Sequence, residues 1–174
     1  MTKLEPAVSP PAALSIGGRI PDVWADGTHG PMQLHRWAAG HFTMIFGHPS
    51  AYATLSERDV ITLAGAQPRF GARGCRILGV TQSDPVTERA WIDSLSERHG
   101  MDIAFPILSD EDGRIAAAFG MSTRGSDDGR EVATTIILDP ELRVRAVLEH
   151  PQSVGRGPEE VLRIVDALAA ATFD

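Results

Sequence analysis

A predicted strand that runs directly into a predicted helix is the feature that most constrains the fold. The apolar run Phe42-Thr43-Met44-Ile45-Phe46 predicts a buried strand, which ends at Gly47-His48-Pro49. Residues 53–66 predict a helix that frays or kinks before Pro68. Open α/β sheets bind ligands where such strands end and the next helices begin. The side chain in the first helical turn is Ser56, and no cysteine is near it.

The rest of the chain alternates between strand-like and helix-like patterns. The pattern predicts an α/β fold with a mixed central sheet and helices on both faces. The expected elements are a strand at 75–81, a helix at 87–99, an extended piece at 106–108, a helix at 110–119, strands at 132–138 and 142–148 around the turn Asp139-Pro140-Glu141, and a last helix that starts at Gly157-Pro158.

Length and charge limit the domain count and the partners. The 174 residues suit one domain at 16–174, preceded by a flexible N-terminal leader at 1–15. The net charge of −7 disfavours nucleic acid and membrane surfaces as partners. No phosphate-binding loop or dinucleotide fingerprint occurs in the sequence, so we expect no cofactor. A cytoplasmic location is the default expectation.

The single cysteine and the histidines exclude two kinds of site. Cys75 has no second cysteine with which to form an intramolecular disulfide or a redox pair. It opens a strand that should be central, so we expect it to be buried. The six histidines show no spacing typical of metal ligands, and we therefore expect no metal site.

Several segments together resemble one known family. The segment FTMIFGHPSAYATLSERDV resembles the active-site segment of peroxiredoxins, the alkyl hydroperoxide reductase and thiol-specific antioxidant group, and is nearest to their one-cysteine branch. Further resemblances, in the family's order, are GGRIPD, ILGVTQSDPVTERAW, FPILSDEDGRIAAAFGM and HPQSVGRGPEEVLRIVDAL. The resemblance covers roughly residues 16 to 170 and implies a thioredoxin-like fold. It also implies self-association, most simply as a homodimer.

The family's catalytic pattern is Pro-Xaa-Xaa-Xaa-Thr-Xaa-Xaa-Cys together with a distant arginine. By this resemblance Pro49 is kept, Ala53 stands in the threonine place and Ser56 in the place of the reactive cysteine. The arginine place falls on Ala133 or on Arg130. Peroxide reduction needs a thiolate, and a serine hydroxyl has no accessible anion at neutral pH. These departures predict that the chain is not a thiol peroxidase.

His48 and Ser56 are the candidate catalytic residues. His48 would act as a general acid or base, or alternatively as a hydrogen-bonded wall residue. Ser56 is either a polar group in a retained pocket or an ordinary residue of the first helical turn. The candidate substrate-binding residues are Pro49, Tyr52 (for which packing is the alternative role), Thr54 and Asp59, the last of which is either solvated or paired with a new partner.

Two classes of function follow from these residues. The first is a redox-neutral, cofactor-free enzyme that catalyses hydrolysis, elimination or isomerisation of a small molecule, for example in specialised metabolism. The second is a non-catalytic protein that binds a ligand or a protein. Convergent polar groups around an open pocket would favour the enzyme, and a pocket closed by side chains would favour the binding protein. A disabled alkyl hydroperoxide reductase is a third, weaker alternative.

Overall fold

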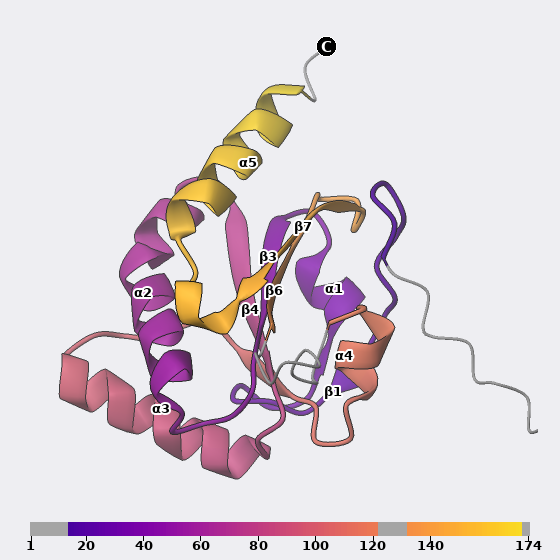
Figure 1. Cartoon of the computed structure of the whole chain (residues 1–174). Helices are drawn as coiled ribbons and strands as arrows, with labels where there is room; N and C mark the ends of the chain where they lie inside the picture. Colours follow the sequence, from indigo (N-terminus) through magenta and orange to yellow (C-terminus); the bar gives the residue numbers. More distant parts are fainter. Residues whose placement is uncertain (1–13, 122–131, 172–174) are drawn as a thin grey trace, which may run out of the picture.

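Five strands form the centre of the molecule (Figure 1). The computed structural model describes residues 14–121 and 132–171, so most of the predicted leader and Arg130 lie outside the described residues. The strand order is β5-β4-β3-β6-β7. β3 is parallel to β4 and β4 to β5, whereas β6 is antiparallel to both β3 and β7. The strands are β3 (Phe42–His48), β4 (Cys75–Thr81), β5 (Ile107–Ser109), β6 (Val132–Leu138) and β7 (Val144–Pro151).

Helices cover both faces of this sheet, as the sequence predicts (Figure 1). One face carries α2 (Thr54–Gly71), α3 (Pro85–His99) and α5 (Pro158–Ala171), and the other carries α1 (Leu34–Ala38) and α4 (Arg114–Ala118). A two-stranded hairpin of β1 (Trp24–Ala25) and β2 (Met32–Gln33) precedes α1, and a short 3₁₀ helix, η1 (Gln152–Val154), follows β7. The sequence did not predict β1, β2, α1 or η1.

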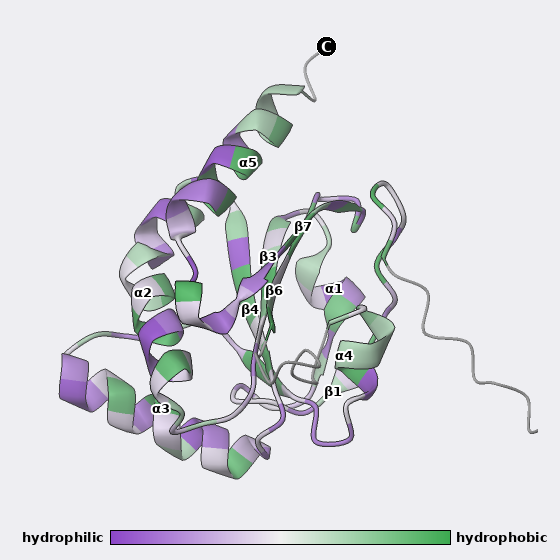
Figure 2. Cartoon of the chain, viewed as in Figure 1, coloured by the Kyte–Doolittle hydropathy of each residue, from purple (hydrophilic) through white to green (hydrophobic). Residues whose placement is uncertain are grey.

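The two layers of the core result from the alternation of side chains along each strand. Met44 and Phe46 of β3 face α2, α3 and α5, while Ile45 faces α1 and α4. Apolar residues therefore line the sheet on both faces, as the green strands at the centre of Figure 2 show. Because both faces are covered, a polar side chain near the end of β3 is buried unless it lies at the edge of the layers.

The helix predicted at 53–66 is longer than expected. The helix continues to Gly71 with the proline inside it. Proline has no N–H and so leaves the carbonyl of Ala64, four residues earlier, without its usual donor. The side-chain amide of Gln67 donates to this carbonyl at 3.0 Å. The missing backbone hydrogen bond is thus replaced by the neighbouring side chain.

The helix predicted at 110–119 is shorter than expected, because Asp110 precedes it rather than belonging to it. The Asp110 carboxylate accepts hydrogen bonds from the backbone N–H groups of Ile115 and Ala116 at 2.8 and 2.9 Å. Acidic side chains satisfy the free N–H groups of a first helical turn in this way. α4 accordingly begins at Arg114.

Candidate functional site

The carboxyl end of β3 and the N-terminus of α2 meet at a tight connection. His48 is the last residue of β3 and lies beside Thr81, the last residue of β4. The connection turns at Tyr52, whose φ of 63° is in the left-handed region that few residues other than glycine adopt. Ala53 precedes the helix without a side-chain cap, and Ser56 is the third helical residue. The predicted strand-to-helix junction is therefore present.

Ser56 lies in the interior. It is fully buried, and its hydroxyl oxygen has no hydrogen-bond partner within the part of the chain that the structure describes. A buried hydroxyl without a partner loses its hydrogen bond to water and gains nothing in return. Ser56 does not line the described cavity at the strand ends. The hydroxyl of Ser56 is thus enclosed by its neighbours.

His48 is also buried, and its ring lies between aromatic side chains. The ring centroid is 6.2 Å from that of Phe46 and 5.5 Å from that of Trp91. Its Nε2 atom lies 2.8 Å from Oε1 of Glu88, and neither side chain is exposed. The distance is that of a hydrogen bond, but the N–H direction does not meet the angle of one, so the contact is a close, bent polar pair. A buried imidazole and a buried carboxylate thus lie in direct contact.

Asp59 has a new partner, which was one of the two alternatives for this residue. The Asp59 carboxylate lies 3.3 Å from Nε of Arg156 and accepts hydrogen bonds from Arg58 at 2.9 and 3.1 Å. Both Asp59 and Arg156 are buried. Burial lowers the pKa of Arg156 to about 10 and Asp59 acts in the opposite direction, so the guanidinium keeps its charge at neutral pH.

Arg156 also holds the ends of two strands together. Its Nη1 donates to the carbonyl of Thr134 and to the hydroxyl of Thr135, both at 3.1 Å, and its Nη2 donates to the carbonyl of Gly47. Ala133, one of the two predicted positions for the arginine, is a buried residue of β6 and carries no charge. The cation near α2 comes instead from the segment after η1.

Sequence reasoning missed Glu88 and Arg156. Arg156 stands in the segment HPQSVGRGPEEVLRIVDAL, so the resemblance contained the signal but assigned it no role. Glu88 lies three residues before Trp91, and this spacing puts both side chains on the same, buried face of α3. A carboxylate on the apolar face of a helix is the pattern that would have identified it.

The other predicted residues lie nearer the surface. Thr54 is exposed, and Pro49 is partly buried. Tyr52 is 63% exposed, with its ring centroid 6.3 Å from that of Trp91, so its predicted packing role is limited to one side of the ring. The structure brings His48, Ser56 and Asp59 into the interior and leaves Tyr52 and Thr54 outside it.

The only thiol of the chain lies at the opposite end of the sheet. Cys75 opens β4 and pairs with Phe42, six residues before His48 in β3. At about 3.3 Å per residue the two ends are roughly 20 Å apart. Cys75 is buried, as predicted, and burial raises the pKa of its thiol to about 12. A thiol with this pKa is almost entirely protonated at neutral pH and is a poor nucleophile.

The described residues contain neither a cluster of metal-binding side chains nor a helix suited to span a membrane. No group of three or more histidine, cysteine or carboxylate side chains is arranged to hold a metal ion in the ranges 14–121 and 132–171. In the same ranges, none of the helices has the length and apolar character that crossing a bilayer requires.

Comparison with known proteins identifies the family. The model of the AhpC/TSA family matches residues 16–147. The chain belongs to this family. A peroxiredoxin of Nanoarchaeum equitans is 30% identical over 158 residues, which are 90% of this chain and 70% of the relative. A 1-Cys peroxiredoxin of Dictyostelium discoideum is 27% identical over 154 residues, which are 88% of this chain and 64% of the relative.

Solved peroxiredoxin structures have the same fold. A yeast mitochondrial 1-Cys peroxiredoxin matches 91% of this chain and 78% of its own, with a TM-score of 0.82 and 24% identity. A cysteine-to-serine mutant of peroxiredoxin 6 from Arenicola marina matches 92% of this chain and 76% of its own, with a TM-score of 0.83 and 22% identity. The predicted thioredoxin-like peroxiredoxin fold is confirmed.

Proposed function

We propose that this AhpC/TSA-family chain does not reduce peroxides through a thiol, and that it binds a small molecule or a protein partner without catalysing a redox reaction. The observation that carries the first part is the position of Cys75. It lies at the end of β4 remote from α2, and its thiol has a pKa of about 12. Such a thiol supplies almost no thiolate at neutral pH.

Ser56 supports the same proposal. We propose that it takes the place of the family's reactive cysteine, because it stands in the first turn of α2 directly after the His48-Pro49 junction. A hydroxyl does not form the sulfenate on which thiol peroxidases depend. Ala53 lacks the hydroxyl that the family's threonine would supply.

The closed interior favours a binding role over catalysis. The side chains of His48 and Glu88 have no exposed surface, and Ser56 has none either. Arg156 is engaged with Asp59 and with backbone carbonyls of β3 and β6. A substrate would therefore have to displace packed side chains to reach any of these groups, and a ligand at the surface would not.

A direct peroxidase assay tests the proposal. We expect the wild-type chain to consume hydrogen peroxide and cumene hydroperoxide no faster than buffer with dithiothreitol as reductant. The Ser56→Cys variant should remain about 100-fold or more below a family peroxidase assayed in parallel, because Ala53 provides no hydroxyl for the peroxide. Wild-type turnover that Cys75→Ser abolishes would overturn the proposal and restore the alkyl hydroperoxide reductase alternative.

A redox-neutral enzyme is the second candidate, and the His48–Glu88 contact favours it. A carboxylate beside one imidazole nitrogen fixes the tautomer and leaves the other nitrogen as a base. If this candidate is correct, the chain should hydrolyse p-nitrophenyl acetate faster than buffer. His48→Gln should abolish that rate, while Tyr52→Phe should retain it. A wild-type rate equal to buffer argues against a hydrolase.

We further propose a homodimer in the cytoplasm. The support for the dimer is β7, which ends the strand order of the sheet and carries the half-exposed Val147. An edge strand offers unpaired backbone groups to a second chain. Sedimentation velocity should give about twice the 18.7 kDa chain mass. A sample that sediments only as the monomer at 100 μM would refute the dimer.

A further inference from the structure

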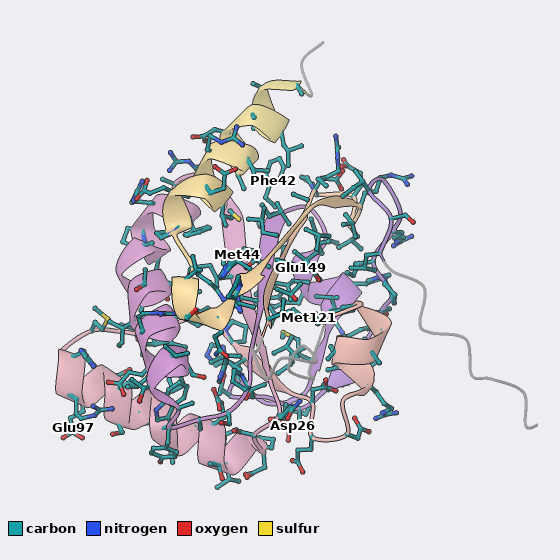
Figure 3. The ribbon with its side chains drawn as sticks, viewed as in Figure 1. Asp26, Phe42, Met44, Glu97, Met121 and Glu149 are labelled. Atoms are coloured by element: carbon teal, nitrogen blue, oxygen red, sulfur yellow. The ribbon has the colours of Figure 1, made fainter. Side chains whose placement is uncertain are left out.

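A hollow lies at the strand ends, beside the apolar layer under α1 and α4. Its volume is about 60 Å³, and it lies between the ends of β3 and β4, the start of β6, and α4. Val80, Ala116 and Met121 line it and belong to the apolar layer under α1 and α4. Figure 3 labels Met121 on this side of the sheet. The hollow reaches the surface at Pro49, which is partly buried, and at Gln82, which is exposed.

A buried hydroxyl without a partner lines this hollow. Thr134 is 3% exposed, and its Oγ1 forms no hydrogen bond within the described ranges. The next residue, Thr135, points to the other face and accepts a hydrogen bond from Arg156. Buried polar atoms in folded proteins nearly always have a partner, which is protein, water or ligand. The Thr134 hydroxyl is therefore available to a bound molecule.

The charges around the hollow select the class of ligand. No lysine or arginine is among the described residues that line it, whereas Asp110 does line it. Both oxygens of that carboxylate are already occupied by the backbone N–H groups of Ile115 and Ala116. The guanidinium of Arg156 donates to the carbonyls of two lining residues, Gly47 and Thr134, but its charge is paired with Asp59. An anion would therefore meet the Asp110 charge with no free cation to offset it. A neutral ligand meets no such penalty.

The volume of the hollow and its apolar lining residues narrow the class of ligand further. A water molecule needs roughly 10–15 Å³ of such volume, so the hollow holds about four waters or an organic group of a few heavy atoms. A Cβ atom at Gly47 would lie 3.3 Å from the Met121 methyl group, so that methyl packs against the β3 backbone at the hollow. Apolar walls with one unsatisfied hydroxyl suit a short carbon chain that ends in one polar group.

We propose that this hollow is the ligand site, and that it binds the end of a small neutral molecule that carries a primary amide or a hydroxyl group. The polar group bonds to Thr134 Oγ1, and the carbon chain lies against Val80, Ala116 and Met121. This inference rests on the proposed binding function and assigns it a site. It places the ligand beside Thr134, in a hollow that Ser56 does not line and where the side chain of His48, a lining residue, has no exposed surface.

The test uses propionamide and 1-propanol as probes and the methyl groups of the protein as reporters. In methyl-labelled full-length chain, each probe should shift the NMR signals of Met121 and Val80 in a saturable manner, with a dissociation constant in the millimolar range. Thr134→Val keeps the shape and removes the hydroxyl, and should weaken binding of propionamide about 5-fold or more.

Thr43→Val is the matched control. Thr43 is also fully buried with a hydroxyl that has no partner in the described ranges, but it lies at the other end of β3 and does not line the hollow. The Thr43→Val variant should bind propionamide with a dissociation constant within a factor of two of that of wild type. Three results would each overturn the inference: no saturable shift in wild type, Thr134→Val binding as wild type does, or shifts centred on methyl groups away from the hollow. The peroxidase assay is independent of these results, so failure here leaves the proposal of lost peroxidase chemistry standing.

Discussion

The two ends of the parallel strands β3 and β4 differ in the interactions that stabilise them. At the end formed by Phe42 and Cys75, an apolar cluster surrounds the thiol and burial raises its pKa to about 12. At the end formed by His48 and Thr81, buried charges from α2, α3 and the segment after η1 converge. The same two strands thus present a chemically inert end and an electrostatically organised one.

The difference shows that the kind of residue matters less than its position in the sheet. Cysteine is the more reactive residue type, yet in an apolar environment at the amino end of β4 it is protonated. Aspartate, arginine, histidine and glutamate at the carboxyl end keep charge or polarity in the interior because they are arranged in pairs. The stability of the amino end should therefore depend on the protonation of Cys75, and the stability of the carboxyl end on the pairing of its buried charges.

The largest expected effect is the loss of the buried pair at the carboxyl end. Asp59→Ala leaves the buried guanidinium of Arg156 without its carboxylate, and this should lower the free energy of unfolding by about 3–5 kcal/mol. Urea denaturation at pH 7 measures it. Asp166→Ala breaks the exposed contact with Arg73 and should change stability little. If Asp59→Ala unfolds with a free energy within 1 kcal/mol of wild type, the pair does not hold this end.

A smaller effect should appear at the amino end, and only at high pH. The Cys75 thiol has a pKa of about 12 in the folded chain, against 9.0 as its ordinary value. Below pH 9 both states keep the proton, so its contribution to stability is fully present. As the pH rises from 9 towards 12 the unfolded chain loses the proton first, and this contribution is lost.

Comparison with Cys75→Ala isolates the titration of this thiol. Between pH 8 and pH 10.5 the free energy of unfolding of wild type should fall by about 2 kcal/mol more than that of Cys75→Ala. Urea denaturation at the two pH values provides both differences. Parallel pH profiles of the two proteins would mean that the thiol is hydrated, and would remove the contrast between the strand ends.

The smallest effect concerns Ser56. Its hydroxyl is buried without a partner in the described ranges, so Ser56→Ala should leave the free energy of unfolding within about 1 kcal/mol of wild type or raise it. Thr81→Val is the control, because the Thr81 hydroxyl accepts a hydrogen bond from the N–H of Ser83 and its loss should cost about 1 kcal/mol. A loss above 2 kcal/mol in Ser56→Ala would reveal a partner for the hydroxyl.

Periodicity was sufficient for the strands of the central sheet. The strand predicted at 75–81 coincides with β4, and the strand predicted to end at Gly47-His48-Pro49 ends at His48. The strand predicted at 142–148 differs more, since β7 spans Val144–Pro151. Long apolar runs that are buried on both faces leave little choice of register. The prediction failed at Pro68 and Asp110, where side chains of Gln67 and Asp110 bond to backbone groups. Local hydrogen bonds of this kind decide helix ends, and hydrophobic periodicity does not record them.

The sequence was sufficient to predict where the site lies, but not which charged residues pair in it. The junction of His48 and Ser56 could be read from the order of strand and helix. The pairing of Glu88 with His48 and of Arg156 with Asp59 could not, since Glu88 and Arg156 reach the junction from segments remote in sequence. Pairing of buried charges depends on how α3 and the segment after η1 dock on the sheet, which a single sequence does not specify. The same limitation led to Ala133 and Arg130 as positions for the arginine.

The outer edge of β5 is covered by the N-terminal part of the chain, and this limits where a second chain can extend the sheet. Gly27 bridges to Leu108, Thr28 donates to Ile107, and Ser109 donates to Asp26, so the outer backbone of β5 is already bonded. A Cβ atom at Gly27 would lie 2.4 Å from the Ile107 carbonyl oxygen, so a larger residue there would force this cover away. Within residues 14–121 and 132–171, the part of β7 beyond Val144 is then the edge that remains for a second copy, because Val144 itself is bonded to Gly17 and Gly18. Two chains that pair through β7 leave only covered edges outside, and the assembly stops at two instead of extending into a fibre.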